Sequence, residues 1–337
     1  MNKKIRWGLL GAGEVVDRWM KGVSQVDDME VVAVASRTEK TAVNIAAKWN
    51  IPKVMNYDEM IHCQDIDIAY IPVPHTAHKQ LAISAMNAGK NVLVEKPAAL
   101  NAKDFVEMIQ CAKDNNVFLM EAVWTRFFPV TKKALEYINE DKIGEVRSVQ
   151  TAFSFRVNDD YKGRLVDINQ GGGGLLDTGV YNLHFMQMIY QKSPIKLFGV
   201  ASMNTDELHI QVDEQASYIG QYDHGELAVM SSGIRTHMID TAYIYGTKGY
   251  IVIPRFWKPT KMQVVIGKHT ECFEEEVPHR VEGIEDEGYQ YEISYVNECI
   301  RTGIKESPYV SFEISHSVLE QCDMLRKEWN LVYSSEK

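Results

Sequence analysis

The chain has 337 residues, of which 45% are hydrophobic, and this length exceeds what one hydrophobic core usually organises, so we expect two domains. Its 46 acidic residues outnumber its 36 lysines and arginines, which gives a formal net charge of −10. An acidic chain without a basic tract binds phosphate backbones and anionic lipid surfaces poorly, so nucleic acid and membranes are excluded as partners.

The cysteine pattern and the apolar segments both predict a soluble, cytoplasmic protein. The five cysteines are odd in number, widely spaced and contain no Cys-x-x-Cys pair, which is typical of reduced thiols. The N-terminal apolar segment is short and soon meets Glu14, and no stretch approaches the ~20 apolar residues of a membrane span. We therefore expect neither a signal peptide nor a transmembrane helix.

Residues 1–122 alternate short apolar runs with stretches of helical spacing. The expected strands cover residues 5–10, 30–35, 68–71, 91–94 and 117–120, and the expected helices cover 15–23, 40–49, 77–88 and 102–115. Strand and helix in alternation indicate βαβ units, and hence a doubly wound parallel sheet. We predict an α/β Rossmann domain over residues 1–122.

Residues 123–337 have a different texture, with several strands in direct succession. The expected strands cover residues 146–156, 197–203, 214–222, 226–234, 241–245 and 262–266, and the expected helices cover 130–139, 180–190, 288–302 and 312–329. Strands joined by polar turns indicate a large, open and mostly antiparallel sheet in an α+β domain. The helices are too few to cover both faces, so we expect sheet packing between subunits.

The first strand leads into a glycine turn that opens a helix. Gly11 and Gly13 permit a tight turn and close backbone approach to a pyrophosphate, and the helix that begins around Glu14 and Val15 supplies N–H donors. The third position of the fingerprint is Val16 instead of glycine, so the motif is incomplete. Its position after a strand and before a helix still favours a dinucleotide site over an ordinary turn.

The end of the second strand indicates which dinucleotide is bound. NAD sites usually place an acid there, whereas this chain has Ser36 and Arg37. An arginine can hydrogen bond a 2′-phosphate or stack on the adenine. We therefore predict NADP(H) over NAD(H), with NAD(H) still possible; a solvent-exposed arginine is the alternative interpretation.

The apolar strand over residues 91–94 ends in Glu95, Lys96 and Pro97. In a doubly wound sheet, ligands bind outside the carboxyl ends of the strands. Proline removes a ladder donor and so ends the strand. An amine at this edge could polarise a substrate hydroxyl or carbonyl, although a surface lysine would give the same pattern.

Three segments together resemble a known family. They are residues 8–13, residues 88–97 after His78, and residues 172–181 with their Asp-x-Gly-x-Tyr motif. The whole chain is similar to the glucose-fructose oxidoreductase/inositol dehydrogenase/MocA family of nicotinamide-dependent oxidoreductases. Residues 120–129 and 246–249 most resemble its dimeric dihydrodiol dehydrogenase and NADP-dependent D-xylose dehydrogenase branch.

The resemblance implies an acid–base pair of Lys96 and Tyr181. Inositol-type members carry a histidine four residues after Asp177, where this chain has Tyr181, so inositol-like substrates are disfavoured. A free phenol, with a pKa near 10, is a slow base, and a neighbouring ammonium favours its phenolate. The expected substrate is a sugar, a polyol or a trans-dihydrodiol. Asp177 either orients this site or caps a helix.

The resemblance also implies ligand contacts elsewhere. The turn with Pro74, His75 and His78 would lie beside the nicotinamide, and Glu95 would join the cofactor site. A metal at His75 and His78 is not expected, since no third ligand has suitable spacing. The expected substrate-binding residues are Trp124, Arg126, Phe127, Arg147, Phe153 and Trp257. Core packing is an equally good explanation for Trp124 and Phe127.

The sequence therefore predicts an NADP-dependent dehydrogenase that assembles as a homodimer or homotetramer through the second-domain sheet. Two alternatives stay open. One is a non-catalytic NADP-binding sensor of the same fold, although such a protein needs neither Lys96 nor Tyr181. The other is an enzyme that holds its cofactor tightly and cycles it between two sugars.

Overall fold

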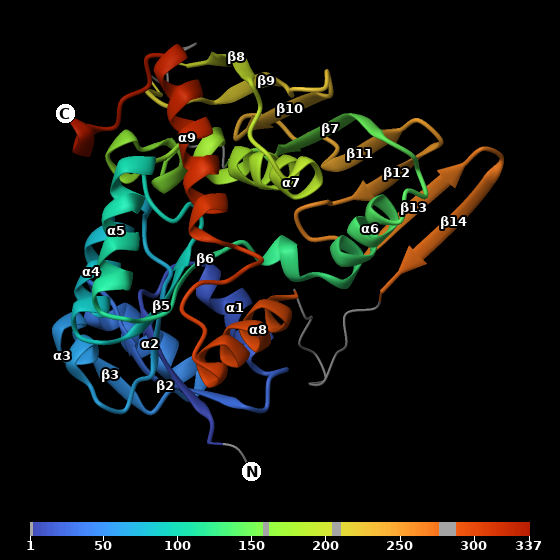
Figure 1. Cartoon of the computed structure of the whole chain (residues 1–337). Coiled ribbons are helices and arrows are strands. Elements are labelled where there is room, and N and C mark those ends of the chain that lie inside the picture. The colour runs from blue at the N-terminus through green and yellow to red at the C-terminus, as the bar shows by residue number, and fades with distance from the viewer. Residues whose placement is uncertain (1–2, 158–161, 204–209, 276–287) are drawn as a thin grey trace. The chain divides into compact units, whose positions relative to one another are not determined.

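A computed structural model of the chain describes residues 3–157, 162–203, 210–275 and 288–337. These residues form two compact units (Figure 1). Unit 1 comprises the described parts of Met1–Ala99, Lys103–Trp124 and Val277–Glu313, and unit 2 those of Leu100–Ala102, Thr125–Glu276 and Ile314–Lys337.

Unit 1 is built on a six-stranded parallel sheet of order β3-β2-β1-β4-β5-β6, as predicted for a Rossmann domain. Its strands are β1 Ile5–Leu10, β2 Met29–Ala35, β3 Lys53–Met55, β4 Ile68–Ile71, β5 Asn91–Glu95 and β6 Leu119–Ala122. The strand order reverses on either side of β1. Such a switch point is where doubly wound sheets bind ligands.

Helices connect and flank the strands of unit 1. They are α1 Val15–Val23, α2 Glu39–Trp49, α3 Tyr57–His62, α4 His78–Asn87, α5 Ala102–Asp114 and α8 Tyr289–Thr302. The core contains a row of rings in which Trp7, Trp19 and Tyr70 lie with centroids 5.4 and 4.6 Å apart. All three side chains are fully buried.

Helix α8 belongs to unit 1, although the sequence predicted a single division near residue 122 with all later residues in the second domain. Helices α1 and α8 lie side by side (Figure 1). They approach so closely that a Cβ on Gly22 would lie 2.5 Å from Cβ of Tyr289. The indole of Trp7 also donates to Asn297 of α8 at 2.9 Å. This long-range packing returns the chain to the first unit.

Unit 2 is built on an eight-stranded sheet of order β14-β13-β12-β11-β7-β10-β9-β8. Neighbouring strands are antiparallel except β7 and β10, which confirms the prediction of a mostly antiparallel sheet. The strands are β7 Val146–Ser154, β8 Lys196–Ser202, β9 Gln215–Gln221, β10 Leu227–Gly233, β11 Thr241–Gly246, β12 Gly249–Pro254, β13 Lys261–Ile266 and β14 His269–Glu274.

Among the described residues, helices pack on one face of this sheet, and apolar side chains of the other face are exposed. Helix α7 (Val180–Tyr190) packs on β7 and β10, and α6 (Pro129–Asn139) packs on β13. The C-terminal helix α9 (Phe312–Glu328) supplies buried residues such as Val318 and Leu325 to the same core. The core of unit 2 therefore lies between the helices and the inner face of the sheet.

The opposite face, which we call the open face, carries apolar side chains in register. Phe198 pairs with Ile219, Ile219 with Val229, and this row continues through Gln150 to Tyr243. The most exposed apolar residues of the open face are between 37% and 75% exposed: Phe198, Val200, Ile219, Leu227, Val229 and Tyr250. This many exposed apolar side chains on one sheet face are unusual on a monomer.

No helix among the described residues has the length and apolar character needed to cross a bilayer. The described residues likewise contain no cluster of three or more His, Cys, Asp or Glu side chains arranged to hold a metal ion.

Candidate active site

Four strands of unit 1 end at one edge of the sheet, and the predicted cofactor residues follow them there. β1 ends before Gly11, β2 before Ser36, β4 before the turn that contains His75, and β5 at Glu95. Because the strands are parallel, their carboxyl ends share an edge. The structure thus brings the glycine turn, Arg37 and Lys96 to the same side of unit 1.

The glycine turn has the shape that a pyrophosphate requires. Gly11 has φ +145°, and a Cβ there would lie 2.8 Å from the carbonyl oxygen of Pro72. A Cβ on Gly13 would lie 3.0 Å from the same oxygen. Helix α1 begins after Glu14 without a side-chain cap, so N–H groups of its first turn are available to an anion. The residues present therefore fit a dinucleotide, and the backbone of Gly13, Glu14 and Val15 would contact its pyrophosphate.

Arg37 lies in the segment that follows β2. Its side chain is exposed. Ser36 precedes it and is half-buried. The guanidinium is therefore accessible at the edge where an adenosine ribose would bind.

The turn after β4 contains two buried histidines. In His78, Nδ1 lies 2.8 Å from the carbonyl oxygen of Pro97, and Nε2 lies 2.9 Å from that of Val73. The ring therefore joins the segments that follow β4 and β5. His75 lies beside it with ring centroids 5.6 Å apart, directly after the half-buried Pro74. Since both nitrogens of His78 face backbone oxygens, its role is to hold this edge together.

Lys96 is half-buried at the end of β5, and its neighbour Glu95 faces the interior of unit 1. The Tyr70 hydroxyl donates to Oε1 of Glu95 at 2.5 Å, and the Lys96 backbone N–H donates to Oε2 at 3.2 Å. Burial raises the pKa of the Glu95 carboxyl. The Glu95 carboxyl is thus engaged by Tyr70 and by its own neighbour, and its predicted cofactor contact stays a prediction.

Two more glutamates lie close to Glu95. Glu292 of α8 is fully buried, and neither of its carboxyl oxygens has a hydrogen-bond partner among the described residues. Burial, reinforced by the charges of Glu95 and Glu121, raises the pKa of Glu292 well above its ordinary value. Glu121 accepts from the backbone N–H of Ala98. Burial among these like charges therefore favours the uncharged form of the Glu292 carboxyl.

Tyr181 of unit 2 lies in a cluster of aromatic rings. Phe153 and Trp257 stack with centroids 4.7 Å apart and an interplanar angle of 7°. The ring of Tyr181 lies edge-on to both, with centroids 5.5 Å from Phe153 and 6.4 Å from Trp257. The indole of Trp257 is fixed by a 2.6 Å hydrogen bond to Asp240. The structure thus brings together three residues that the sequence placed in the site.

Asp177 lies in a π-helical turn, Leu175–Gly179, that runs directly into α7. It is not a cap residue, because the turn begins after Gly174 and α7 begins after Gly179. Its Oδ1 accepts from Arg164 at 3.0 Å. The helix-cap interpretation therefore does not match the structure, and an orienting role for Asp177 stays a hypothesis.

Four predicted substrate residues lie in other surroundings. Trp124 stacks on Tyr289 of α8, and Phe127 is 1% exposed, so both have the environment of core residues. Arg126 is buried and donates to the Gln187 side chain at 2.7 Å. Arg147 pairs with Glu145 at the start of β7, about 20 Å along the strand from Phe153. We therefore leave these four out of the proposal below.

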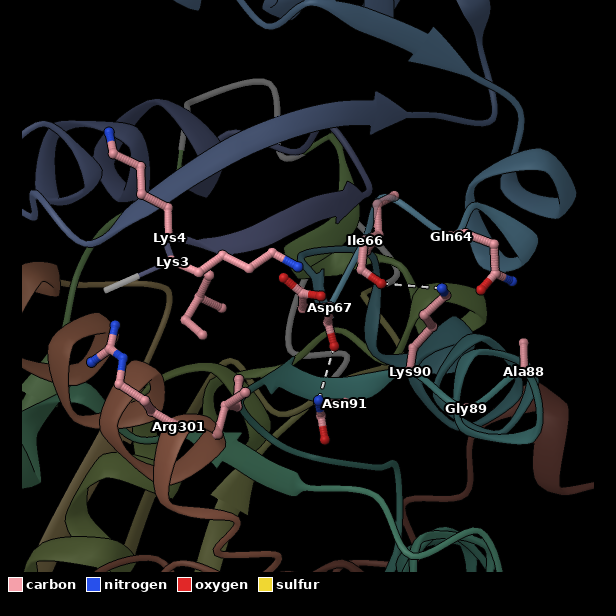
Figure 2. A pocket seen from close by; sticks show the side chains of 12 residues that line it. Lys3, Lys4, Gln64, Ile66, Asp67, Ala88, Gly89, Lys90, Asn91 and Arg301 are labelled. Atoms are coloured by element: carbon pink, nitrogen blue, oxygen red, sulfur yellow. Dashed lines mark hydrogen bonds between the residues drawn. The ribbon is translucent and has the colours of Figure 1, made fainter. Parts of the chain in front are cut away.

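A pocket of about 640 Å³ lies at the opposite, amino-terminal edge of the unit 1 sheet (Figure 2). Its charges are largely paired: Lys90 donates to the carbonyl oxygens of Cys63 and Ile66, and Arg301 pairs with Asp28. Figure 2 shows Lys3 directed toward Asp67. The pocket lies at the opposite edge from the strand ends that carry the predicted cofactor residues, so we do not assign it to the cofactor site.

Comparisons with known proteins define the class. A family model described as "Oxidoreductase family, NAD-binding Rossmann fold" matches residues 5–123, and the GFO/IDH/MocA C-terminal domain matches residues 131–252. The trans-1,2-dihydrobenzene-1,2-diol dehydrogenase of Mus musculus is 34% identical over 99% of both chains. That of Xenopus tropicalis is 34% identical over 97% of this chain and 99% of its own.

Solved structures share the fold. An aldose-aldose oxidoreductase from Caulobacter crescentus superposes with a TM-score of 0.87 at 23% identity, covering 97% of this chain and 98% of that chain. Levoglucosan dehydrogenase, in complex with NADH and levoglucosan, superposes with a TM-score of 0.84 at 20% identity, covering 97% of both chains.

The chain therefore belongs to the Gfo/Idh/MocA oxidoreductase family, as the sequence predicted. It is an NAD(P)-dependent dehydrogenase that acts on CH–OH groups.

The buried carboxyl of Glu292 predicts a pH-dependent stability. Its folded pKa exceeds its unfolded value, so the folded state binds the extra proton and loses stability as the pH rises above about 4.5. Glu292→Gln does not titrate, and its free energy of unfolding relative to the wild type should rise by up to about 1.4 kcal/mol per pH unit. Denaturant unfolding at pH 5, 6, 7 and 8 measures this difference.

Glu298→Gln is the matched control, because Glu298 lies on the same helix and is exposed. The difference in free energy of unfolding between Glu298→Gln and the wild type should show no comparable rise with pH. A Glu292→Gln difference that is equally flat would contradict a buried, protonated Glu292.

Proposed function

We propose that this protein oxidises a secondary alcohol on a sugar, a polyol or a trans-dihydrodiol, and catalyses the reverse reduction, with NADP(H) as its preferred cofactor. The observation that carries the proposal is the environment of Tyr181, a phenol bordered by the stacked rings of Phe153 and Trp257. The relatives that are 34% identical are named trans-1,2-dihydrobenzene-1,2-diol dehydrogenases, and this supports a cyclic diol substrate.

In this proposal Tyr181 and Lys96 act on the same substrate hydroxyl. The phenolate of Tyr181 takes the hydroxyl proton as the carbon gives up its hydride, and the phenol returns the proton in the reverse direction. The ammonium of Lys96 favours the phenolate and polarises the same oxygen. When bound, the nicotinamide ring supplies the hydride acceptor or donor. The buried contact from Tyr70 to Glu95 holds the strand end from which Lys96 extends.

The aromatic rings give this site a preference for flat, apolar faces. Phe153 and Trp257 stack nearly parallel, so they act as one rigid wall beside Tyr181. Such a wall suits the apolar face of a pyranose or the ring of a cyclohexadiene diol. The hydrogen bond from Trp257 to Asp240 fixes the indole, which limits the conformational entropy lost on binding.

The preference for NADP(H) rests on Arg37. This exposed guanidinium follows β2, at the position where an acid would otherwise accept from a ribose 2′-hydroxyl. A planar guanidinium can bind a 2′-phosphate through paired hydrogen bonds, and an acid would repel it.

We also propose that the open face of the unit 2 sheet pairs with that of a second copy of this chain. The in-register apolar row from Phe198 through Ile219 and Val229 offers a self-complementary surface, and a twofold axis would bring two such faces together. The homodimer and the homotetramer both remain compatible with this arrangement.

Removing the hydroxyl of Tyr181 tests the catalytic assignment. Tyr181→Phe should lower kcat for diol or sugar oxidation by about 10²–10⁴-fold, because no group then accepts the proton. The Kd for NADPH should change less than about threefold, since the glycine turn that we assign to the cofactor belongs to unit 1. Steady-state kinetics over a panel of sugars and diols, with NADPH fluorescence titration, provides both values.

Tyr137→Phe is the control, since this hydroxyl lies on α6 and donates to the exposed Glu271 at 2.8 Å. It should turn over at the wild-type rate. A Tyr181→Phe enzyme that keeps its full kcat would remove Tyr181 from the mechanism.

Cofactor choice is tested at Arg37. Arg37→Ala should raise the Kd for NADPH by about 10- to 100-fold through the loss of a charge-assisted phosphate contact, and leave the Kd for NADH within about twofold. Lys103→Ala, which removes an exposed cation from α5, should alter neither constant. An equal loss for both cofactors in Arg37→Ala would refute a 2′-phosphate contact.

Oligomerisation is tested by a charge on the open face. Val229→Lys should shift the protein to the monomer in light scattering, because a buried unpaired ammonium at an interface is costly. Val106→Lys places the same charge on another exposed valine, on α5, and should not change the mass. A Val229→Lys protein that stays fully oligomeric would show that another surface forms the interface.

A further inference from the structure

The helix that carries Tyr181 begins at an unusual place. The Gly171–Gly174 turn leads directly into the π-helical turn Leu175–Gly179, which continues into α7. Gly174 is the cap residue, and it has no side chain to accept from the first backbone N–H groups. In a buried helix such groups must find an acceptor elsewhere.

Asp213, which precedes β9, supplies that acceptor. Its Oδ2 accepts from the Leu175 backbone N–H at 2.5 Å. Its backbone carbonyl oxygen accepts from the Gly174 backbone N–H at 2.8 Å. The side chain is fully buried. A Cβ on Gly173 would lie 2.1 Å from Oδ1, so only glycine lets the carboxyl group approach this closely. A distant segment thus caps the start of the helix.

A second contact fixes the same turn from the other side. The Thr178 hydroxyl donates to the Gly174 carbonyl oxygen at 2.8 Å, and the Gly233 backbone N–H donates to the Thr178 hydroxyl at 3.3 Å. Together with Asp213, these bonds determine where the turn starts. Asp177 and Tyr181 follow on the continuous helical backbone, so their positions depend on that start.

The charge of Asp213 is suited to this contact and costly to bury. A carboxylate at a helix N-terminus interacts favourably with the helix dipole. Burial raises the pKa of Asp213 to about 7, and the Leu175 hydrogen bond and the charge of Arg326 oppose this shift. The other titratable groups of this region are Tyr218 on β9, Tyr333 near the C-terminus and Cys322 on α9.

We propose that Asp213 is a positioning residue for the reaction of Tyr181, since its carboxyl group holds the first turn of the helix from which the phenol extends. This inference rests on the proposed function. Asp213 does not reach substrate or cofactor in this account; it acts through the Leu175 amide.

The test compares Asp213→Ala, which removes the acceptor, with Asp213→Asn, which keeps a carbonyl oxygen of similar reach. Asp213→Ala should lower kcat at least tenfold while KM and the Kd for NADPH stay within about threefold. Asp213→Asn should stay within about threefold of the wild-type kcat. The control is Glu214→Gln, a neighbouring buried acid whose carboxylate pairs with Arg235 at 2.7 Å, and it should keep the wild-type kcat.

Amide hydrogen exchange at Leu175 gives a readout that does not depend on turnover. Asp213→Ala should exchange this amide at least tenfold faster than the wild type, and Glu214→Gln should not. If the wild type turns over no substrate of the panel, the proposed function fails, and the exchange data still decide whether Asp213 holds the helix start.

Three results would overturn the proposal. They are a wild-type kcat in Asp213→Ala, an equal loss of kcat in Glu214→Gln, or an unchanged Leu175 amide in Asp213→Ala. If Asp213→Ala does not fold, the pH dependence decides. Protection of the Leu175 amide, corrected for intrinsic exchange, should fall between pH 8 and pH 6 in the wild type and stay constant in Asp213→Asn; equal profiles would refute the contact.

Discussion

The parallel pairing of β1, β2, β4 and β5 is the constraint on which the account depends. It places four strand ends at one edge, and each is followed by residues that we propose for the cofactor site. Gly11 lets the turn after β1 pass close to the Pro72 carbonyl oxygen, and the His78 ring contacts the backbone oxygens of Val73 and Pro97 and so joins the segments after β4 and β5. Lys96 lies at this edge because it directly follows β5, which ends at Glu95.

In unit 2, the aromatic rings beside Tyr181 and the start of its helix are held by separate elements. Its sheet supplies Phe153 from β7, and the segment after β12 supplies Trp257, so the rings beside Tyr181 rest on separate elements of one core. The start of the Tyr181 helix depends on a buried carboxyl group and a run of glycines. The proposed mechanism therefore requires precise positions in both units, each maintained by its own buried polar contacts.

Local patterns predicted most of the elements and the fold of each unit, because the periodicity of apolar residues in strands and helices is a property of neighbouring residues. The short β3, with three residues, has too little periodicity to detect. Helix α8 was recognised but assigned to the wrong side of the domain division, since its packing on Gly22 and Trp7 joins residues more than 250 positions apart.

The site was predicted only in part, because some of its contacts also depend on long-range packing. Tyr181, Phe153 and Trp257 cluster as expected, whereas Arg147 lies at the far end of β7 and Trp124 stacks within unit 1. Asp213 was missed, because its contact with Leu175 depends on a close approach across 38 residues and leaves no local motif.

The most direct test of the central claim is an experimental structure with NADP⁺ and a bound diol. The account predicts Lys96 Nζ and Tyr181 Oη within about 3.2 Å of one substrate oxygen, and side chains that face separate cavities would contradict it.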